Sequence, residues 1–164
     1  MNDEIPNRKN NRLFGYDYSE KGAYFITICA ANREKLFGVV VGGGAFDAPF
    51  VKLSAAGQII DKYVRSTNRI DGVIVEKYVI MPNHLHLLVS VNKDDGTSRA
   101  PSPTNALIPH LVSTLKRFAN REIGRNVFQR SYHDHVVRNE EDFLSIWSYI
   151  DENPAKWSQD EFYI

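Results

Sequence analysis

Two histidines, His84 and His86, flank a single leucine inside a stretch with the composition of a β-strand, and this spacing constrains the fold more than any other feature. Because successive strand side chains point to opposite faces of a sheet, both imidazoles lie on one face, together with Leu88 and Ser90. The other face carries only apolar side chains, Leu85, Leu87, Val89 and Val91. The strand is therefore predicted to have one core face and one face where two imidazoles, roughly 6–7 Å apart along the backbone, could share a metal ion. A surface pair or a hydrogen-bonded structural pair of histidines would show the same spacing. Other residues that could join the histidines must therefore decide whether the pair binds a metal.

Composition sets the class of protein. The chain has 164 residues, of which 43% are hydrophobic and 24% charged, values typical of one globular domain (1–164) with a real core. Cys29 is the only cysteine, so no intramolecular disulfide can form and a reducing cytoplasm is expected. No apolar run approaches the ~18 residues of a membrane span, and the N-terminus lacks the order of a signal peptide. We expect a cytoplasmic domain without a membrane partner, with the polar residues 1–20 forming an exposed arm.

Periodicity predicts the order β-α-β-β-α-β followed by one more helix. The strands are expected at 23–30, at 73–80, at the histidine stretch and at 131–137, and the helices from Ser54 to about 68, around 109–124, and from 140 to about 152. The first six elements are those of a ferredoxin-like sandwich, an α+β fold with an antiparallel sheet. In that fold the histidine strand is central and two helices cover one sheet face. The C-terminal helix is then the natural cover for the face that carries the histidines.

Two further expectations concern less regular segments. Gly42-Gly43-Gly44 and Pro49 lack the setting of a phosphate-binding loop, so the segment is interpreted as a flexible insert, and 94–103 as a second loop. The helix that begins near Pro109 is expected to bury an apolar stripe formed by Leu111, Leu115, Phe118 and Ala119.

Charge is unevenly spread although the net charge is zero. Residues 110–138 contain six Lys or Arg and two acids, whereas 139–164 contain seven acids and one Lys. A basic segment can follow phosphates in an otherwise neutral protein, and a solvated helix face has the same composition. If the segment binds DNA, the expected phosphate contacts are Lys116, Arg117, Arg121 and Arg130.

The last helix carries the candidate partners of the histidines. Its apolar stripe is formed by Phe143, Ile146, Trp147 and Ile150, while Tyr149 and Asn153 are four residues apart and so share a side. Two imidazoles and an amide oxygen would leave positions on a divalent ion free for a phosphate. A neighbouring phenol could then attack phosphorus and form a covalent phosphotyrosine. Tyr149 could instead be a core tyrosine, and Asn153, before Pro154, a helix cap.

Other residues could take related roles. Tyr132 lies beside the basic segment and is a second candidate nucleophile, but no residue accompanies it at a fixed helical spacing. His133 and His135 alternate on the predicted fourth strand, where they could ligate a metal, contact DNA or serve a structural role.

Several separated motifs occur in a fixed order along the chain. They are Tyr16-Asp17-Tyr18-Ser19, residues 22–29, Met81-Pro82-Asn83-His84-Leu85-His86, residues 128–135 and Tyr149-Ile150-Asp151-Glu152-Asn153-Pro154. At these residues the chain resembles the single-tyrosine HUH (histidine–hydrophobic–histidine) transposases, specifically the REP-associated tyrosine transposases. Phe128 stands where many relatives have Trp, a difference that does not touch the chemistry.

The resemblance implies a ferredoxin-like homodimer that cleaves and rejoins single-stranded DNA next to hairpins, with no small-molecule substrate. It implies a Mg²⁺ or Mn²⁺ site formed by His84, His86 and Asn153, with Tyr149 as the nucleophile that forms a 5′-phosphotyrosine link. Whether Tyr149 serves its own chain's metal or that of a partner stays open. A domesticated repeat-processing enzyme with the same chemistry and a non-catalytic hairpin-binding protein also remain open.

Overall fold

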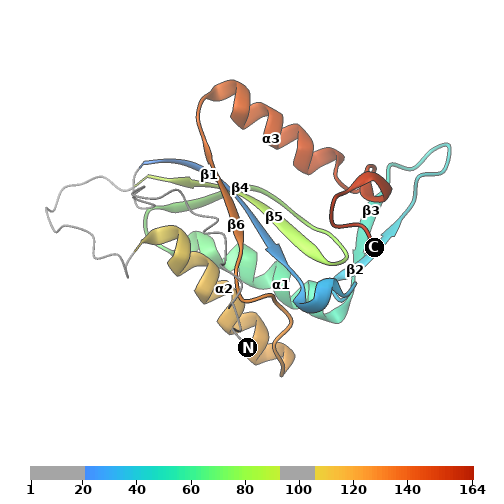
Figure 1. The fold of residues 1–164 in the computed structure, drawn as a ribbon, viewed down its shortest axis with the longest axis horizontal. Coiled ribbons are helices and arrows are strands. Elements are labelled where there is room, and N and C mark those ends of the chain that lie inside the picture. The colour runs from blue at the N-terminus through green and yellow to red at the C-terminus, as the bar shows by residue number, and fades with distance from the viewer. Residues whose placement is uncertain (1–20, 93–105) are drawn as a thin grey trace, which may run out of the picture.

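The computed structural model describes residues 21–92 and 106–164. The predicted arm (1–20) and the predicted loop 94–103 lie outside these residues. The central element is a four-stranded antiparallel sheet in the order β4-β5-β1-β6 (Figure 1), formed by β1 (Gly22–Cys29), β4 (Val73–Ile80), β5 (His84–Val91) and β6 (His133–Val137). The histidine strand β5 is thus central, as predicted, and the order agrees with a ferredoxin-like arrangement.

Helices lie on both sides of this sheet. Helices α1 (Ala55–Ser66) and α2 (Leu107–Ile123) cover one face, and α3 (Glu140–Glu152) lies over the other (Figure 1). Local chemistry sets their ends: the Ser54 side chain accepts a hydrogen bond from the Gly57 N–H at the start of α1. Gly124, with a φ of +85°, ends α2 in the left-handed conformation that glycine adopts readily. In the described parts of the chain, no helix combines the length and the apolar character needed to cross a bilayer.

The main core lies between the sheet and helices α1 and α2. Every second residue of β5 enters it, and Leu85, Leu87 and Val89 are fully buried there. The opposite face forms a smaller apolar cluster under α3, built from Leu88, Ile146 and Ile150. The alternation that the sequence predicts for β5 is therefore present, and α3 covers the histidine face.

A short hairpin replaces the predicted flexible insert. Strands β2 (Gly38–Val41) and β3 (Phe50–Leu53) pair as a separate two-stranded antiparallel sheet, and the triple glycine forms part of their connection. The glycine and proline breakers predict a loop, but the β-branched residues on either side of them favour strands and pair with each other. The hairpin is held against α1, because the Ser54 N–H donates to the Phe37 carbonyl at 2.9 Å. A Cβ on Gly57 would lie 2.0 Å from that carbonyl oxygen, so only glycine fits there.

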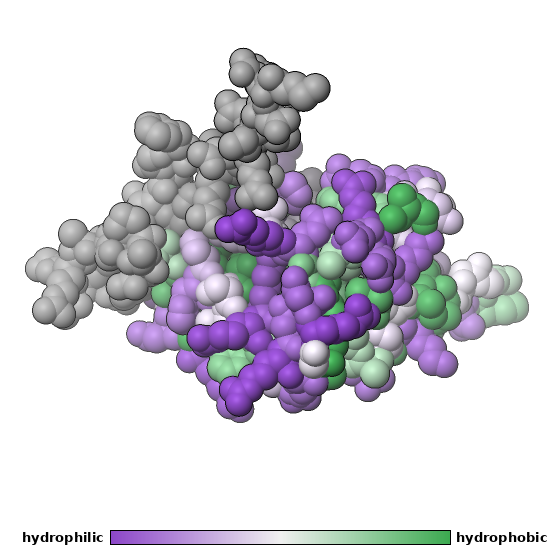
Figure 2. All heavy atoms as spheres, turned by 60° about the horizontal axis from the view of Figure 1, so that its bottom comes forward, coloured by the Kyte–Doolittle hydropathy of each residue, from purple (hydrophilic) through white to green (hydrophobic). Residues whose placement is uncertain are grey.

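One predicted core residue lies at the surface. Phe118 is 38% exposed and stacks on Tyr63 of α1 at a ring-centroid distance of 5.8 Å, whereas the other members of its predicted stripe are buried. The side of the molecule that carries α1 and α2 is otherwise covered mainly by hydrophilic side chains (Figure 2). Phe118 therefore packs against α1 at the solvent-exposed side of the contact between the two helices.

Candidate functional site

The two histidines are oriented by neighbours on their ring Nδ1 atoms. His86 lies opposite Thr27 of β1, and its Nδ1 is 2.8 Å from the Thr27 hydroxyl. The Nδ1 of His84 is 2.9 Å from the amide oxygen of Asn83. The Asn83 amide nitrogen donates to the Phe162 carbonyl at 2.7 Å, which settles the orientation of this amide. Since an amide oxygen only accepts, His84 carries its proton on Nδ1 and presents a lone pair at Nε2.

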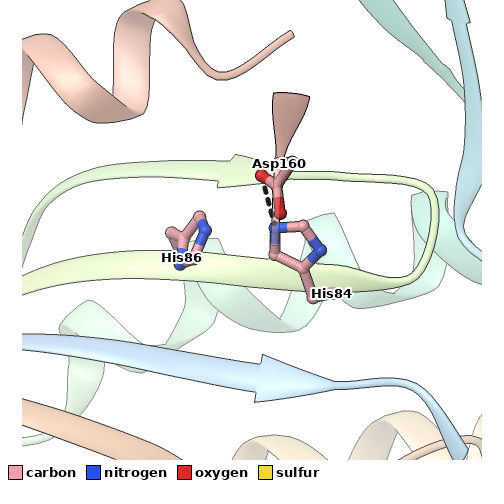
Figure 3. A group of neighbouring side chains, drawn as sticks. All are labelled: His84, His86 and Asp160. Atoms are coloured by element: carbon pink, nitrogen blue, oxygen red, sulfur yellow. Dashed lines mark ion pairs between the residues drawn. The ribbon is translucent and has the colours of Figure 1, made fainter. Parts of the chain in front are cut away.

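A carboxylate from the C-terminal segment completes a group of three ligand atoms. Asp160 Oδ2 is 3.7 Å from His84 Nε2, and both side chains are almost fully buried (Figure 3). One ligand atom each from His84, His86 and Asp160 lie within 4.8 Å of one another. Sequence reasoning missed Asp160, because it lies in an irregular segment and was counted only as part of the acidic C-terminal region.

Tyr149 and Asn153, the two residues expected from α3, reach this group. The Tyr149 hydroxyl is 3.5 Å from His86 Nε2, and 39% of the residue is exposed, so the phenol lies neither in the apolar interior nor far from the imidazoles. Asn153 is the C-terminal cap residue of α3 by its backbone, and its buried side chain donates from Nδ2 to Asp160 Oδ2 at 3.2 Å. Asn153 therefore caps α3 with its backbone and contributes its side chain to the site.

The donor set fits a divalent cation. Within the described residues, His84 Nε2 and the Asn153 amide oxygen are buried without a hydrogen-bond partner. A buried lone pair without a donor is costly, and a cation at this point would satisfy both atoms and the adjacent carboxylate. Two imidazoles with a carboxylate and an amide oxygen form a mixed nitrogen and oxygen set that could hold a divalent ion such as Mn²⁺ or Mg²⁺. His84, His86, Asp160 and Asn153 are therefore the residues that could hold the ion.

Burial controls protonation in the site. It lowers the pKa of His84 to about 4, with the Asp160 charge and the Asn153 side chain opposing the change, and it lowers the pKa of His86 well below 6.5. Both rings are thus neutral near pH 7, which is the form that binds metals. Burial and the Asp160 charge raise the pKa of Tyr149, while Asn153 opposes them. A nearby cation would lower the pKa of Tyr149 and so favour the phenolate.

Aromatic rings enclose the imidazoles. The Phe25 ring stacks on His86 at 5.0 Å and meets the Tyr149 ring edge-on at 5.9 Å. On the other side, the Phe162 ring lies 4.6 Å from the His84 ring and Trp157 lies 6.0 Å from it. These rings restrict water around the histidines and strengthen the electrostatic interactions inside the site.

The predicted phosphate contacts lie elsewhere. Arg117 and Arg121 are exposed on α2, across the sheet from the histidines, and Arg130 is exposed just before β6. The Lys116 ammonium donates to the carbonyl oxygens of Gln129, Arg130 and Ser131 at 2.8, 3.4 and 3.0 Å, which engages all three of its donors. Lys116 therefore holds the segment that leads into β6, and its phosphate contact stays a prediction.

The remaining candidates, Tyr132, His133 and His135, lie on different faces of the sheet. Tyr132 packs against the main core on the helix side, away from His86, so its geometry does not support it as a nucleophile. His133 pairs with Thr27 and His135 with Phe25, which places both histidines on the face that carries His86. His135 Nε2 contacts Asp142 of α3 at 2.8 Å. Neither histidine belongs to the group of converging ligand atoms.

Comparisons with known proteins concern the family and the fold of the chain. No protein family profile matches the chain. A Haemophilus influenzae protein described only as "Uncharacterized protein" is 31% identical and covers 98% of this chain and 95% of its own length. A "Putative REP-associated tyrosine transposase" of the same species is 27% identical over 85% of this chain and 74% of its own length. A solved REP-associated tyrosine transposase bound to a REP hairpin has the same fold, with a TM-score of 0.62 and 19% identity, over 92% of this chain and 76% of that one.

The fold and the site define an α+β domain that gathers a histidine pair, a carboxylate and a tyrosine between a central strand and a C-terminal helix. The chain belongs to the same family as the 31% identical Haemophilus protein. It is related to the REP-associated tyrosine transposases, which confirms the resemblance that its motifs predict.

Proposed function

We propose that this protein cleaves and rejoins single-stranded DNA next to hairpins, with Tyr149 as the nucleophile and a divalent metal as cofactor. The observation that carries the proposal is the position of the phenol, 3.5 Å from His86 Nε2 and beside two buried lone pairs that no described residue satisfies. The related transposase that was solved with a REP hairpin supports DNA hairpins as the substrate class.

The proposed chemistry is an in-line displacement at phosphorus. The Tyr149 oxygen forms a bond to the scissile phosphorus, and the bond from phosphorus to the 3′-oxygen breaks. The phenol loses its proton and the leaving 3′-oxygen gains one, so the products are a 5′-phosphotyrosine and a free 3′-hydroxyl. A 3′-hydroxyl of another strand reverses the step, so strands are exchanged without an external energy source.

Residues around the phenol have separate tasks in this proposal. His84, His86, Asp160 and Asn153 would hold Mn²⁺ or Mg²⁺, which would neutralise charge on a nonbridging phosphate oxygen. Thr27 and Asn83 fix the two imidazole rings so that their Nε2 atoms face the site. The exposed side of Tyr149 lets DNA approach, while the surrounding rings limit water that would compete with the 3′-hydroxyl.

The position of the basic residues suggests a path for the DNA. Arg117 and Arg121 lie on the helix side, and Arg130 leads into β6, the edge strand of the sheet. We propose that these arginines contact phosphates of the hairpin stem and that the unpaired strand passes around the β6 edge to Tyr149. Phosphate contacts of this kind position a nucleic acid without reading its sequence.

A denaturation-resistant adduct tests the chemistry. Purified protein is incubated with Mn²⁺ and labelled single-stranded hairpin oligonucleotides that carry unpaired flanks, and then analysed on a denaturing gel. Wild-type protein should form a covalent adduct, and Tyr149→Phe should abolish it while hairpin binding is retained. Tyr132→Phe is the matched control and should leave the adduct. Binding without any adduct would favour a non-catalytic hairpin-binding protein, and loss of the adduct in Tyr132→Phe would refute the assignment of Tyr149.

A mixing experiment tests which chain supplies the tyrosine. The phenol and the histidines meet within one chain, so we propose that Tyr149 serves its own metal site. Equal amounts of Tyr149→Phe and His84→Ala proteins should then form no adduct together, as each fails alone. Recovery of about a quarter to a half of the wild-type yield would show that the tyrosine acts on the site of a partner chain.

A further inference from the structure

A cavity of about 350 Å³ lies beside the histidine site and shares three residues with it, Phe25, Thr27 and Phe162. It is lined from β1, β6, the turn η1 (Ala31–Arg33) and the C-terminal segment, by residues that include Phe25, Thr27, Arg33, His133, Glu161 and Phe162. Thr27 also holds the His86 ring, and Phe25 stacks on it. The cavity therefore adjoins the site on the sheet face that carries the two histidines.

The lining does not suit a phosphate. Among the lining residues, Arg33 and Glu161 carry opposite charges, so positive charge is not concentrated there. Phosphate sites in proteins instead gather several cationic or N–H donors without acids. The same lining combines phenyl rings with donors and acceptors around an edge, which is the pattern that recognises a flat heteroaromatic ring with polar edges.

The size and the position of the cavity restrict its occupant. Its volume is near the lower end of the range for small-molecule pockets, which is too small for a DNA duplex and adequate for one nucleobase. It is lined by the edge strand β6, around which the unpaired strand is proposed to pass. A base that entered here would remain attached to a backbone lying next to the Tyr149 hydroxyl.

We infer that this cavity receives one unpaired base of the DNA strand, next to the phosphate that Tyr149 attacks. The inference rests on the proposed function and adds a positional preference to it. Glu161 would accept a hydrogen bond from an amino or ring N–H of the base, and His133 would form a wall of the cavity. Sequence choice at the cleavage site would then be made by this cavity and the hairpin would be recognised elsewhere.

Abasic scanning of the substrate tests the inference. The Tyr149→Phe protein, which cannot form the adduct, is titrated with fluorescent hairpin oligonucleotides in which each unpaired position in turn lacks its base. We expect one position, next to the cleavage point that wild-type protein defines, to lose about tenfold in affinity, a loss within the range for one stacked base. A 2-aminopurine at that position should be quenched on binding, because stacking quenches its fluorescence.

Cavity variants make the test specific. In the Tyr149→Phe background, Glu161→Gln and His133→Ala should bind the unmodified oligonucleotide more weakly and lose most of the abasic effect. Glu140→Gln, an exposed acid of α3 outside the cavity, should retain the full effect. An abasic effect of the same size in both cavity variants, or no sensitive position at all, would overturn the inference while hairpin binding remained. If the unmodified hairpin does not bind, the proposed function fails and this inference fails with it.

Discussion

The two faces of strand β5 are equally buried and differ in how their polar atoms are satisfied. Leu85 and Leu87 on one face, and His84 and His86 on the other, are all at most 1% exposed. On the helix side, the partly buried Lys116 ammonium has three carbonyl acceptors. On the α3 side, His84 Nε2 and the Asn153 amide oxygen have no hydrogen-bond partner among the described residues.

Under the proposed function, this difference separates residues that stabilise the fold from residues that would serve the chemistry. Apolar side chains and satisfied polar groups lower the free energy of the folded state, whereas a buried lone pair without a donor raises it. A protein that keeps such atoms next to a half-exposed phenol retains an unfavourable arrangement that a cation and a substrate can relieve. In the proposed function, the α3 face carries the chemistry and the α1–α2 face stabilises the fold.

The largest effect expected from this comparison is on stability. Leu87 and Leu88 are neighbours, both fully buried, and they point to opposite faces. Leu87→Ala should lower the free energy of unfolding by about 4 kcal/mol, near the upper end of the range for such changes, because the main core cannot close the cavity. Leu88→Ala should cost about 2 kcal/mol, because its smaller cluster under α3 relaxes more easily. Urea unfolding of both variants measures the difference. An equal or larger loss for Leu88→Ala would contradict the division between a stabilising α1–α2 face and a less tightly packed α3 face.

Metal removal should give the next largest effect. Mn²⁺ at a hundred times its dissociation constant should raise the unfolding free energy of the wild type by about 2.7 kcal/mol relative to chelator, since binding to the folded state stabilises it. His84→Leu should lose this gain, because it removes a lone pair that converges on the site. His133→Leu, on the same face and outside the ligand group, should keep it. An identical response of His84→Leu and wild type would place the metal elsewhere.

The smallest effect concerns Lys116 and pH. Burial lowers its pKa to about 8, so between pH 8 and 10.5 the unfolded chain binds more protons than the folded one. The unfolding free energy should therefore rise with pH in this window, by on the order of 1 kcal/mol after allowance for solvent screening of this partly exposed group, relative to Lys116→Met. Chemical unfolding at pH 8, 9 and 10 measures the slope, with Lys52→Met, a change at an exposed lysine, as the control. A difference that falls with pH would mean that the carbonyl contacts outweigh burial.

Much of the fold follows from local patterns. The period of β5, the Ser54 cap, the Gly124 end of α2 and the bounds of α3 depend on neighbours in the sequence, so they could be predicted. The β2–β3 hairpin could not, because its short strands depend on pairing with each other and on the contact between Phe37 and α1. Phe118 shows the same limit. The helical period predicts that it faces a neighbouring element, but only the tertiary position of α1 decides how far the Tyr63 ring covers it.

The sequence by itself determined that two imidazoles share a face and that a phenol and an amide share a side of the last helix, because side-chain direction repeats along regular elements. Only the tertiary structure decided that Asp160 joins them, that Asn83 and Thr27 orient the rings, and that Lys116 is engaged with the backbone. These contacts join segments that are far apart in the chain or have no period. No local periodicity encodes them. Thr27 meets His86 when β1 pairs with β5, and Lys116 reaches the segment that leads into β6. Asp160, and the Phe162 carbonyl that fixes Asn83, arrive when the C-terminal segment folds back over the central strand.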